Sequence, residues 1–268
     1  MPRTIPHRAP AAVAAAVVLA LAACGGGAGT STPASGTAAR GSPQLTGSLV
    51  VFAAASLTEA FNDGAHMLEA NNPGFTATFS FAGSQQLVVS VRNGAPADVI
   101  ATADMATMQT LVVAGLVDAP QTFAHNTLEI AVARGNPKGI RTLADLADPG
   151  VSVVLADATV PAGRFARQSL QKAGVTVSPK SNELDVRSTL QKVESGDADA
   201  AIVYSTDVLA AADRVDGVVI PDGLNVSAAY PIAVLRATLH PAAAAAFVRE
   251  AVSGDVQQAL LRRGFRAP

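Results

Sequence analysis

Blocks of apolar and polar positions along the first part of this chain predict strands and helices in turn. Residues 48–54 form an unbroken apolar run, as in a strand buried on both faces, and residues 57–70 then follow a helical pattern. Later segments continue the order: a strand at 75–83, a helix from Ser84, a strand at 97–104 and a helix capped by Asp104. This β-α-β-α-β-α order is typical of a parallel sheet with crossover helices.

The second part of the chain has the same kind of pattern, without a repeat of fixed period. We expect strands at 127–135, 151–157, 198–204, 217–223 and 228–235, helices that begin at Pro161 and Val186, and two closing helices from His240-Pro241 to Gly264. Two α/β sets of this length predict two lobes. The cleft between lobes, at the carboxyl ends of the strands, is the usual ligand position in such folds.

The N-terminal residues are expected to lie outside this fold. Arg3 and Arg8 precede an apolar stretch of signal-peptide length, which ends in the sequence LAAC at Cys24. This resembles a bacterial lipobox, so we expect a signal peptide at 1–23, lipid on Cys24 and a flexible tether at 24–46. The alternatives are a plain secretory signal or an uncleaved membrane helix. The apolar stretch is short for a membrane span, and Cys24 is the only cysteine.

Composition narrows the class of ligand. A formal net charge of −2 offers no basic field to nucleic acid. Tryptophan is absent and aromatic residues make up 4% of the chain, which argues against stacking platforms for bases. The four histidines are scattered without metal-ligand spacing. We therefore expect no cofactor and no bare metal cation.

Four predicted helix starts share one arrangement. Ser56, with Glu59 three residues later, matches a capping box; the other starts lie at Ser84, Ala162 and Val186. A helix start offers unpaired N–H groups and the positive end of the helix dipole, which suits an anion. The spacing does not show that these starts meet, and most capping serines only cap their helix. If they did meet, with the Tyr204 phenol at a strand end, they would form a cage of neutral donors for a tetrahedral oxyanion.

Several motifs resemble the periplasmic molybdate-binding proteins of ABC importers, in order and over nearly all of the chain from about Ser48 to Phe265: FAAASLTEAF, FAGSQQL, GAPADVIATAD, VPAGRFARQSLQKAG, DVRSTLQKVESGDADAAIVYSTD and YPIAVL. The resemblance implies a two-lobed α/β periplasmic binding-protein fold of type II, each lobe a mostly parallel sheet flanked by helices. Lobe 1 would comprise 47–127 and 229–268, lobe 2 would comprise 128–228, and the joining strands would cross near 124–130 and 224–230.

The same resemblance implies the site and the function. Ser56, Ser84 and Tyr204 would supply hydroxyls to the anion, and Ala162 and Val186 would supply backbone N–H groups. The chain would capture molybdate, and tungstate by the same donors, as a monomeric, lipid-anchored protein at the outer face of the cell membrane. It would deliver the anion to the membrane subunits of an ABC importer.

Alternatives stay open at this point. One is a different oxyanion, such as sulfate or phosphate. Another is a serine hydrolase using Ser56 or Ser84, although the G-x-S-x-G elbow is missing around both. Gly83 and Gln85 flank Ser84 where many relatives carry a serine-rich segment. We expect Arg164 and Arg187 to face solvent or pair with an acidic residue near a helix start rather than to touch the anion.

Overall fold

The computed structural model describes residues 45–268. The signal peptide, Cys24 and nearly all of the tether fall in residues 1–44, outside the described residues. Leu45 is buried, and its N–H donates to the Asn72 side chain at 2.9 Å. Both hydrophobic clusters lie within 45–268, so this part carries its own core and we expect it to fold alone. Within it, no helix combines the length and apolar character needed to cross a membrane.

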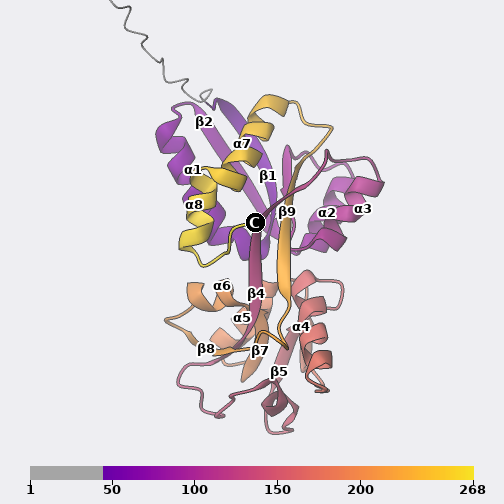
Figure 1. The fold of residues 1–268 in the computed structure, drawn as a ribbon, viewed down its shortest axis with the longest axis vertical. Helices are drawn as coiled ribbons and strands as arrows, with labels where there is room; N and C mark the ends of the chain where they lie inside the picture. Colours follow the sequence, from indigo (N-terminus) through magenta and orange to yellow (C-terminus); the bar gives the residue numbers. More distant parts are fainter. Residues whose placement is uncertain (1–44) are drawn as a thin grey trace, which may run out of the picture. The chain divides into compact units, whose positions relative to one another are not determined.

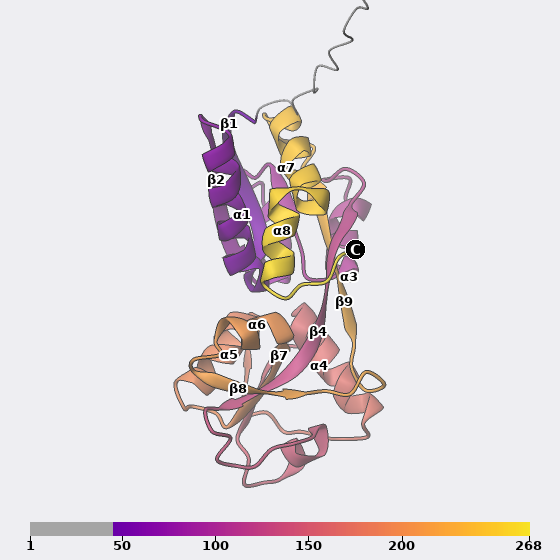
Figure 2. The ribbon, with the colours of Figure 1, turned by 60° about the vertical axis from the view of Figure 1, so that its left-hand side comes forward.

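Two α/β lobes lie one above the other along the long axis of the described part (Figures 1 and 2). Lobe 1 is built from β1 (Gly47–Ala54), β2 (Phe75–Ala82), β3 (Val99–Ala101), α1 (Thr58–Asn71), α2 (Ser84–Arg92), α3 (Met105–Val113), α7 (Pro241–Ser253) and α8 (Asp255–Arg262). Lobe 2 is built from β5 (Val153–Ala156), β6 (Ser181–Glu183), β7 (Ala200–Tyr204), β8 (Val215–Val219), α4 (Pro161–Lys172), α5 (Val186–Glu194), α6 (Ser205–Ala210) and the 3-10 turn η2 (Leu143–Ala147).

Two long strands run between the lobes: β4 (Gln121–Ala133) and β9 (Ser227–Val234). Residues 121–127 of β4 pair antiparallel with β9, whereas Leu128 onward pairs with β7 and β8. The strand order is β2-β1-β3-β9-β4-β7-β5-β6, with β8 also on β4. The change of partner after Thr127 supports a division between the lobes there.

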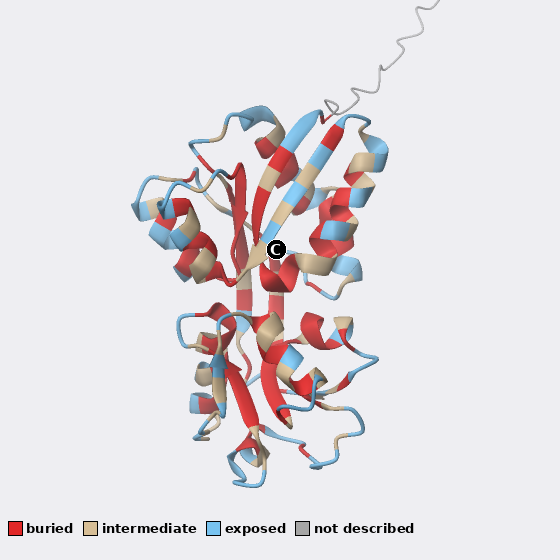
Figure 3. Cartoon of the chain, turned by 180° about the vertical axis from the view of Figure 1, so that it is seen from behind, coloured by how far each residue is buried: buried red, intermediate tan, exposed pale blue. Residues whose placement is uncertain are grey.

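Both faces of the lobe 1 sheet are covered, which explains the unbroken apolar run of β1. Leu49, Val51 and Ala53 face the cluster that includes α1, α7 and α8, whereas Phe52 faces the cluster of α2 and α3. A strand between two helical layers has no solvent face, so its sequence does not alternate. Figure 3 shows the buried strands in both lobes. The α/β class and the flanking helices are therefore confirmed. The sheet is mixed rather than mostly parallel: β1 pairs parallel with β2 and β3, and β5 with β6 and β7, whereas the pairs of β4 and β9 are antiparallel because these strands run between the lobes.

Several local predictions were incomplete or wrong. The strand predicted at 127–135 begins at Gln121, the strand predicted at 217–223 is β8 at 215–219, and β6 and α6 were not predicted. The predicted capping box of Ser56 and Glu59 is also wrong. The chain makes a 3-10 turn, η1 (Ala55–Leu57), after β1, and α1 begins at Thr58 without a side-chain cap. Ser56, in the turn, and Glu59, in the first turn of α1, have distant partners instead, which are described below.

Candidate functional site

One small cavity lies between the two lobes, at the carboxyl ends of their strands. Segments of both lobes line it: Ala54, Ala55, Ser56, Ala82, Gly83, Ser84 and Ala103 from lobe 1, and Val160, Pro161, Ala162, Asp185, Val186 and Tyr204 from lobe 2. This lining includes every residue that the sequence suggested as an anion contact. It contains no lysine or arginine, so an anion here would meet no cationic side chain.

Ser56 reaches the cavity from the turn that follows β1. Its side chain is buried, and its Oγ lies 3.0 Å from the hydroxyl of Tyr230 on β9. Ser56 is therefore held by a partner in a strand that joins the lobes, not by the N–H groups of α1.

Ser84 is the first residue of α2, after Gly83 at the N-cap position. Its buried Oγ accepts a hydrogen bond from the Ala103 N–H at 3.0 Å. The neighbouring residues reflect a close approach of the lobes. A Cβ on Gly83 would lie 2.5 Å from the Leu184 carbonyl oxygen, and the Gln85 amide donates to that same oxygen at 2.7 Å.

Ala162 and Val186 bring two helix starts of lobe 2 to the cavity. The first hydrogen bond of α4 runs from the Arg164 N–H to the Val160 carbonyl oxygen at 3.0 Å, which leaves the Ala162 N–H without an intrahelical acceptor. In α5, the Asp185 side chain accepts from the Ser188 N–H, and the Val186 N–H is likewise left over. Both N–H groups are thus available to a ligand at the positive end of a helix dipole.

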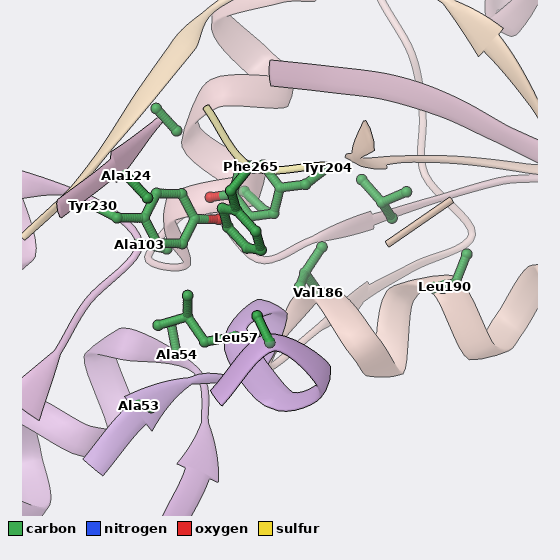
Figure 4. Close-up of a cluster of buried hydrophobic side chains, with 14 of the residues drawn as sticks. Ala53, Ala54, Leu57, Ala103, Ala124, Val186, Leu190, Tyr204, Tyr230 and Phe265 are labelled. Atoms are coloured by element: carbon green, nitrogen blue, oxygen red, sulfur yellow. The ribbon is translucent and has the colours of Figure 1, made fainter. Parts of the chain in front are cut away.

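Tyr204 ends β7 and lies almost wholly buried, at 1% exposure. Its hydroxyl has no hydrogen-bond partner among the described residues, although such buried groups are rarely left unpaired. Burial, followed by the neighbouring Tyr230, raises the pKa of Tyr204 well above its ordinary value, so the hydroxyl keeps its proton. Figure 4 shows the hydroxyls of Tyr204 and Tyr230 pointing toward one another. The Tyr204 hydroxyl is a buried donor at the edge of the cavity.

Arg164 and Arg187 do not line the cavity. As expected, each pairs with an acidic residue close to a helix start, and in both cases that residue belongs to lobe 1. Arg187 Nη2 lies 2.5 Å from Glu59 Oε1, and Arg164 pairs with Asp104, which also caps α3. The two ion pairs therefore connect the lobes beside the cavity.

Two buried residues near the cavity were missed from the sequence. Tyr230 belongs to the YPIAVL motif, but nothing in that pattern marked its hydroxyl as a partner of Ser56. Asp207 follows Tyr204 in α6 and is 1% exposed. Burial raises the pKa of Asp207 to about 7. Its position three residues after a strand end resembles an ordinary helix start, so its burial left no signal in the sequence.

Comparisons with known proteins show the family of this chain. Residues 49–266 match the model of the bacterial extracellular solute-binding protein family. The molybdate-binding protein ModA of Mycobacterium tuberculosis (strain ATCC 25618 / H37Rv) is 42% identical over 257 residues, which cover 96% of each chain.

Solved structures give the same fold. The periplasmic molybdate-binding protein of Azotobacter vinelandii has a TM-score of 0.72 at 18% identity, over 82% of this chain and 99% of that one. The sulfate-binding protein SubI from Mycobacterium tuberculosis H37Rv has a TM-score of 0.73 at 22% identity, over 82% of this chain and 86% of that one. Fold alone thus does not distinguish these two anions. On the family match and the close relative together, the chain belongs to the bacterial extracellular solute-binding proteins.

Proposed function

We propose that this protein captures molybdate in the cavity between its lobes and delivers it to the membrane subunits of an ABC importer. The observation that carries the proposal is the Tyr204 hydroxyl, buried in the cavity without a partner. Leaving such a donor unpaired costs free energy, which a bound acceptor would recover. The 42% identity to a molybdate-binding protein supports the choice of anion.

The proposed contacts are the hydroxyls of Ser56, Ser84 and Tyr204 and the N–H groups of Ala162 and Val186. All five can donate, and both helix starts add the favourable end of a dipole. The only carboxylate in the lining, Asp185, accepts hydrogen bonds from Ser188 through both oxygens. A fully deprotonated oxyanion could use all five groups as donors. A protonated phosphate would need an acceptor for its proton, and both oxygens of the lining carboxylate already accept hydrogen bonds.

Entry of the anion requires the lobes to part. The cavity volume is about 10 Å³, close to the space for one water molecule, and a tetrahedral oxyanion is larger. Since β4 and β9 are the strands that run between the lobes (Figure 1), a hinge motion about them would open the cleft. Closure would then bring Ala162, Val186 and Tyr204 onto an anion that already contacts Ser56 and Ser84.

The remaining parts of the function are proposed from the sequence. Tungstate would bind through the same donors because it is nearly the size of molybdate. The protein would act as an exported, monomeric binding protein rather than an enzyme, and lipid on Cys24 would hold it at the outer face of the cell membrane. The second candidate function is capture of sulfate or phosphate. It remains an alternative because a sulfate-binding protein has the same fold.

A ligand series on purified residues 43–268 tests the proposal. A ligand that binds only the folded state stabilises it by about 4.1 kcal/mol at a thousandfold excess over its dissociation constant. For a protein of this size each kcal/mol raises the melting temperature by roughly 2–4 °C. Molybdate and tungstate should therefore raise it by about 8–16 °C, and sulfate and phosphate far less. An equal shift with sulfate or phosphate would favour the second candidate, and no shift with any oxyanion would refute anion capture.

A further inference from the structure

Tyr230 lies behind the cavity and does not line it. It sits on β9, opposite Ala124 of β4, where the two joining strands pair. Its side chain is fully buried, with its ring edge-on to Phe123, Tyr204 and Phe265 at centroid distances of 5.5–6.3 Å. The hydroxyl lies 3.0 Å from Ser56 Oγ, and the polar side chains of Tyr204 and Asn126 are also near it.

The direction of this hydrogen bond decides what Ser56 can do. A serine hydroxyl has one proton and two acceptor lone pairs. If Ser56 donated to Tyr230, it would have no proton left for an anion. If Tyr230 donates, the Ser56 oxygen is held by an accepted bond and its proton is free to point elsewhere.

Ser84 shows the second arrangement with no ambiguity. A backbone N–H can only donate, so the 3.0 Å contact from Ala103 fixes the Ser84 oxygen as acceptor. The Ser84 proton is then left for the cavity that this residue lines. If Tyr230 donates, it stands in the same relation to Ser56 as the Ala103 N–H does to Ser84. Burial raises the pKa of Tyr230 above its ordinary value, so its hydroxyl also keeps the proton that it would donate.

We propose that Tyr230 is a positioning residue for the anion site: its hydroxyl donates to Ser56 Oγ and so turns the Ser56 proton toward the bound anion. The inference rests on the proposed function, because Ser56 is taken as a contact of the anion. In this arrangement a residue of β9, a strand that joins the lobes, orients the hydroxyl of Ser56 on lobe 1. The orientation of this donor is thereby tied to the hinge.

A double-mutant cycle on residues 43–268 tests this, with molybdate affinity measured by isothermal titration. Tyr230→Phe removes one buried oxygen and keeps the ring. We expect it to weaken molybdate binding about three- to tenfold, the usual range for one hydrogen bond. In the Ser56→Ala background the same change should have almost no further effect, because the group that it positions is gone.

The other tyrosine of the chain supplies a matched control. Tyr204→Phe removes a hydroxyl that would meet the anion directly, so its loss of affinity should persist in the Ser56→Ala background. A purely structural role for Tyr230 would also give additive losses, and that result would refute the inference. So would unchanged affinity in Tyr230→Phe. If the wild-type protein itself binds no oxyanion, the proposed function fails, whatever the variants do.

A second measurement does not depend on how well Tyr230→Phe folds. Placing 3-fluorotyrosine at position 230 makes the hydroxyl a stronger donor and a weaker acceptor, at almost the same volume. If Tyr230 donates to Ser56, molybdate affinity should equal or exceed that of the wild type. Lower affinity would contradict the inference, because a stronger donor to Ser56 should not weaken the orientation that it provides.

Discussion

The buried carboxyl of Asp207 allows a sharp test of the electrostatics behind the cavity. Its side chain accepts a hydrogen bond from the Tyr204 N–H at 3.1 Å. Burial raises its pKa to about 7, Arg187 on α5 opposes that rise, and Glu59 on α1 and Asp185 add to it. The carboxyl is therefore protonated in the folded protein at pH values where the unfolded chain has already lost that proton.

The sign and size of the effect follow from the two pKa values. The ordinary value is 3.8 and the folded value is about 7, a difference of about 3 units, or of the order of 4 kcal/mol. Because the folded state binds the proton more tightly, the stabilising contribution is largest below pH 3.8. It falls as pH rises between the two values and is lost above about pH 7. From pH 5 to pH 8 the free energy of unfolding should drop by about 3 kcal/mol on account of this group.

Urea unfolding of wild type and Asp207→Asn at both pH values measures this contribution. The amide keeps the shape of the side chain and can still accept from the Tyr204 N–H, but it does not titrate. The variant should therefore gain about 3 kcal/mol relative to the wild type between pH 5 and pH 8. Asp222→Asn, at an exposed position, should run parallel to the wild type. If Asp207→Asn also runs parallel, the carboxyl is ionised in the folded protein at pH 5 and the reasoning is refuted.

Three further changes have definite expected results. Gly163→Ala should destabilise the protein by about 1–3 kcal/mol and weaken molybdate binding in titration. The new Cβ would overlap the backbone oxygens of Ala156 and Asp157 and displace the adjacent Ala162 N–H. Gly223→Ala is the control and should change neither stability nor binding, because its Cβ meets nothing within 4 Å. Glu59→Gln removes the ion pair with Arg187 between the lobes, and a partly exposed pair of this kind is worth about 0.2–1 kcal/mol. Molybdate binding should therefore weaken by up to about fivefold at low salt and by less at high salt. Asp118→Asn, which breaks an exposed ion pair within lobe 1, should leave the affinity unchanged at either salt concentration. Cys24→Ser should abolish metabolic lipid labelling and membrane association in cell fractions, and equal labelling of both forms would contradict a lipid anchor.

The parallel strand pairs and their crossover helices could be predicted because their signal is local. The unbroken apolar run of β1 and the helical pattern of α1 each report on burial by neighbouring layers. The helix caps at Asp104 and Asp185 are equally local, since each side chain accepts from the N–H three residues later.

The strand that joins the lobes was only half predicted, since its surroundings change along its length. Residues 121–127 of β4 pair with β9, residues 128–133 pair with β7 and β8, and the register shifts between Thr122 and Ala124. A segment whose neighbours change in this way has no single period. Only its second half, from Thr127, carried a pattern that could be recognised as a strand.

The failed capping box shows which part of a site a sequence leaves undetermined. Its spacing was correct, but Ser56 found a partner 174 residues later and Glu59 found one 128 residues later. Parallel strands direct their carboxyl ends to one edge, so the donors that follow them could be expected near a common cleft. Whether a hydroxyl there keeps its proton for a ligand depends on what already donates to it. For Ser84 that donor is a backbone N–H nineteen residues away, and for Ser56 it is the candidate donor Tyr230, on a strand from the far end of the chain. Motif reasoning could thus suggest the proposed contacts, whereas the orientation of their hydroxyls required the three-dimensional structure.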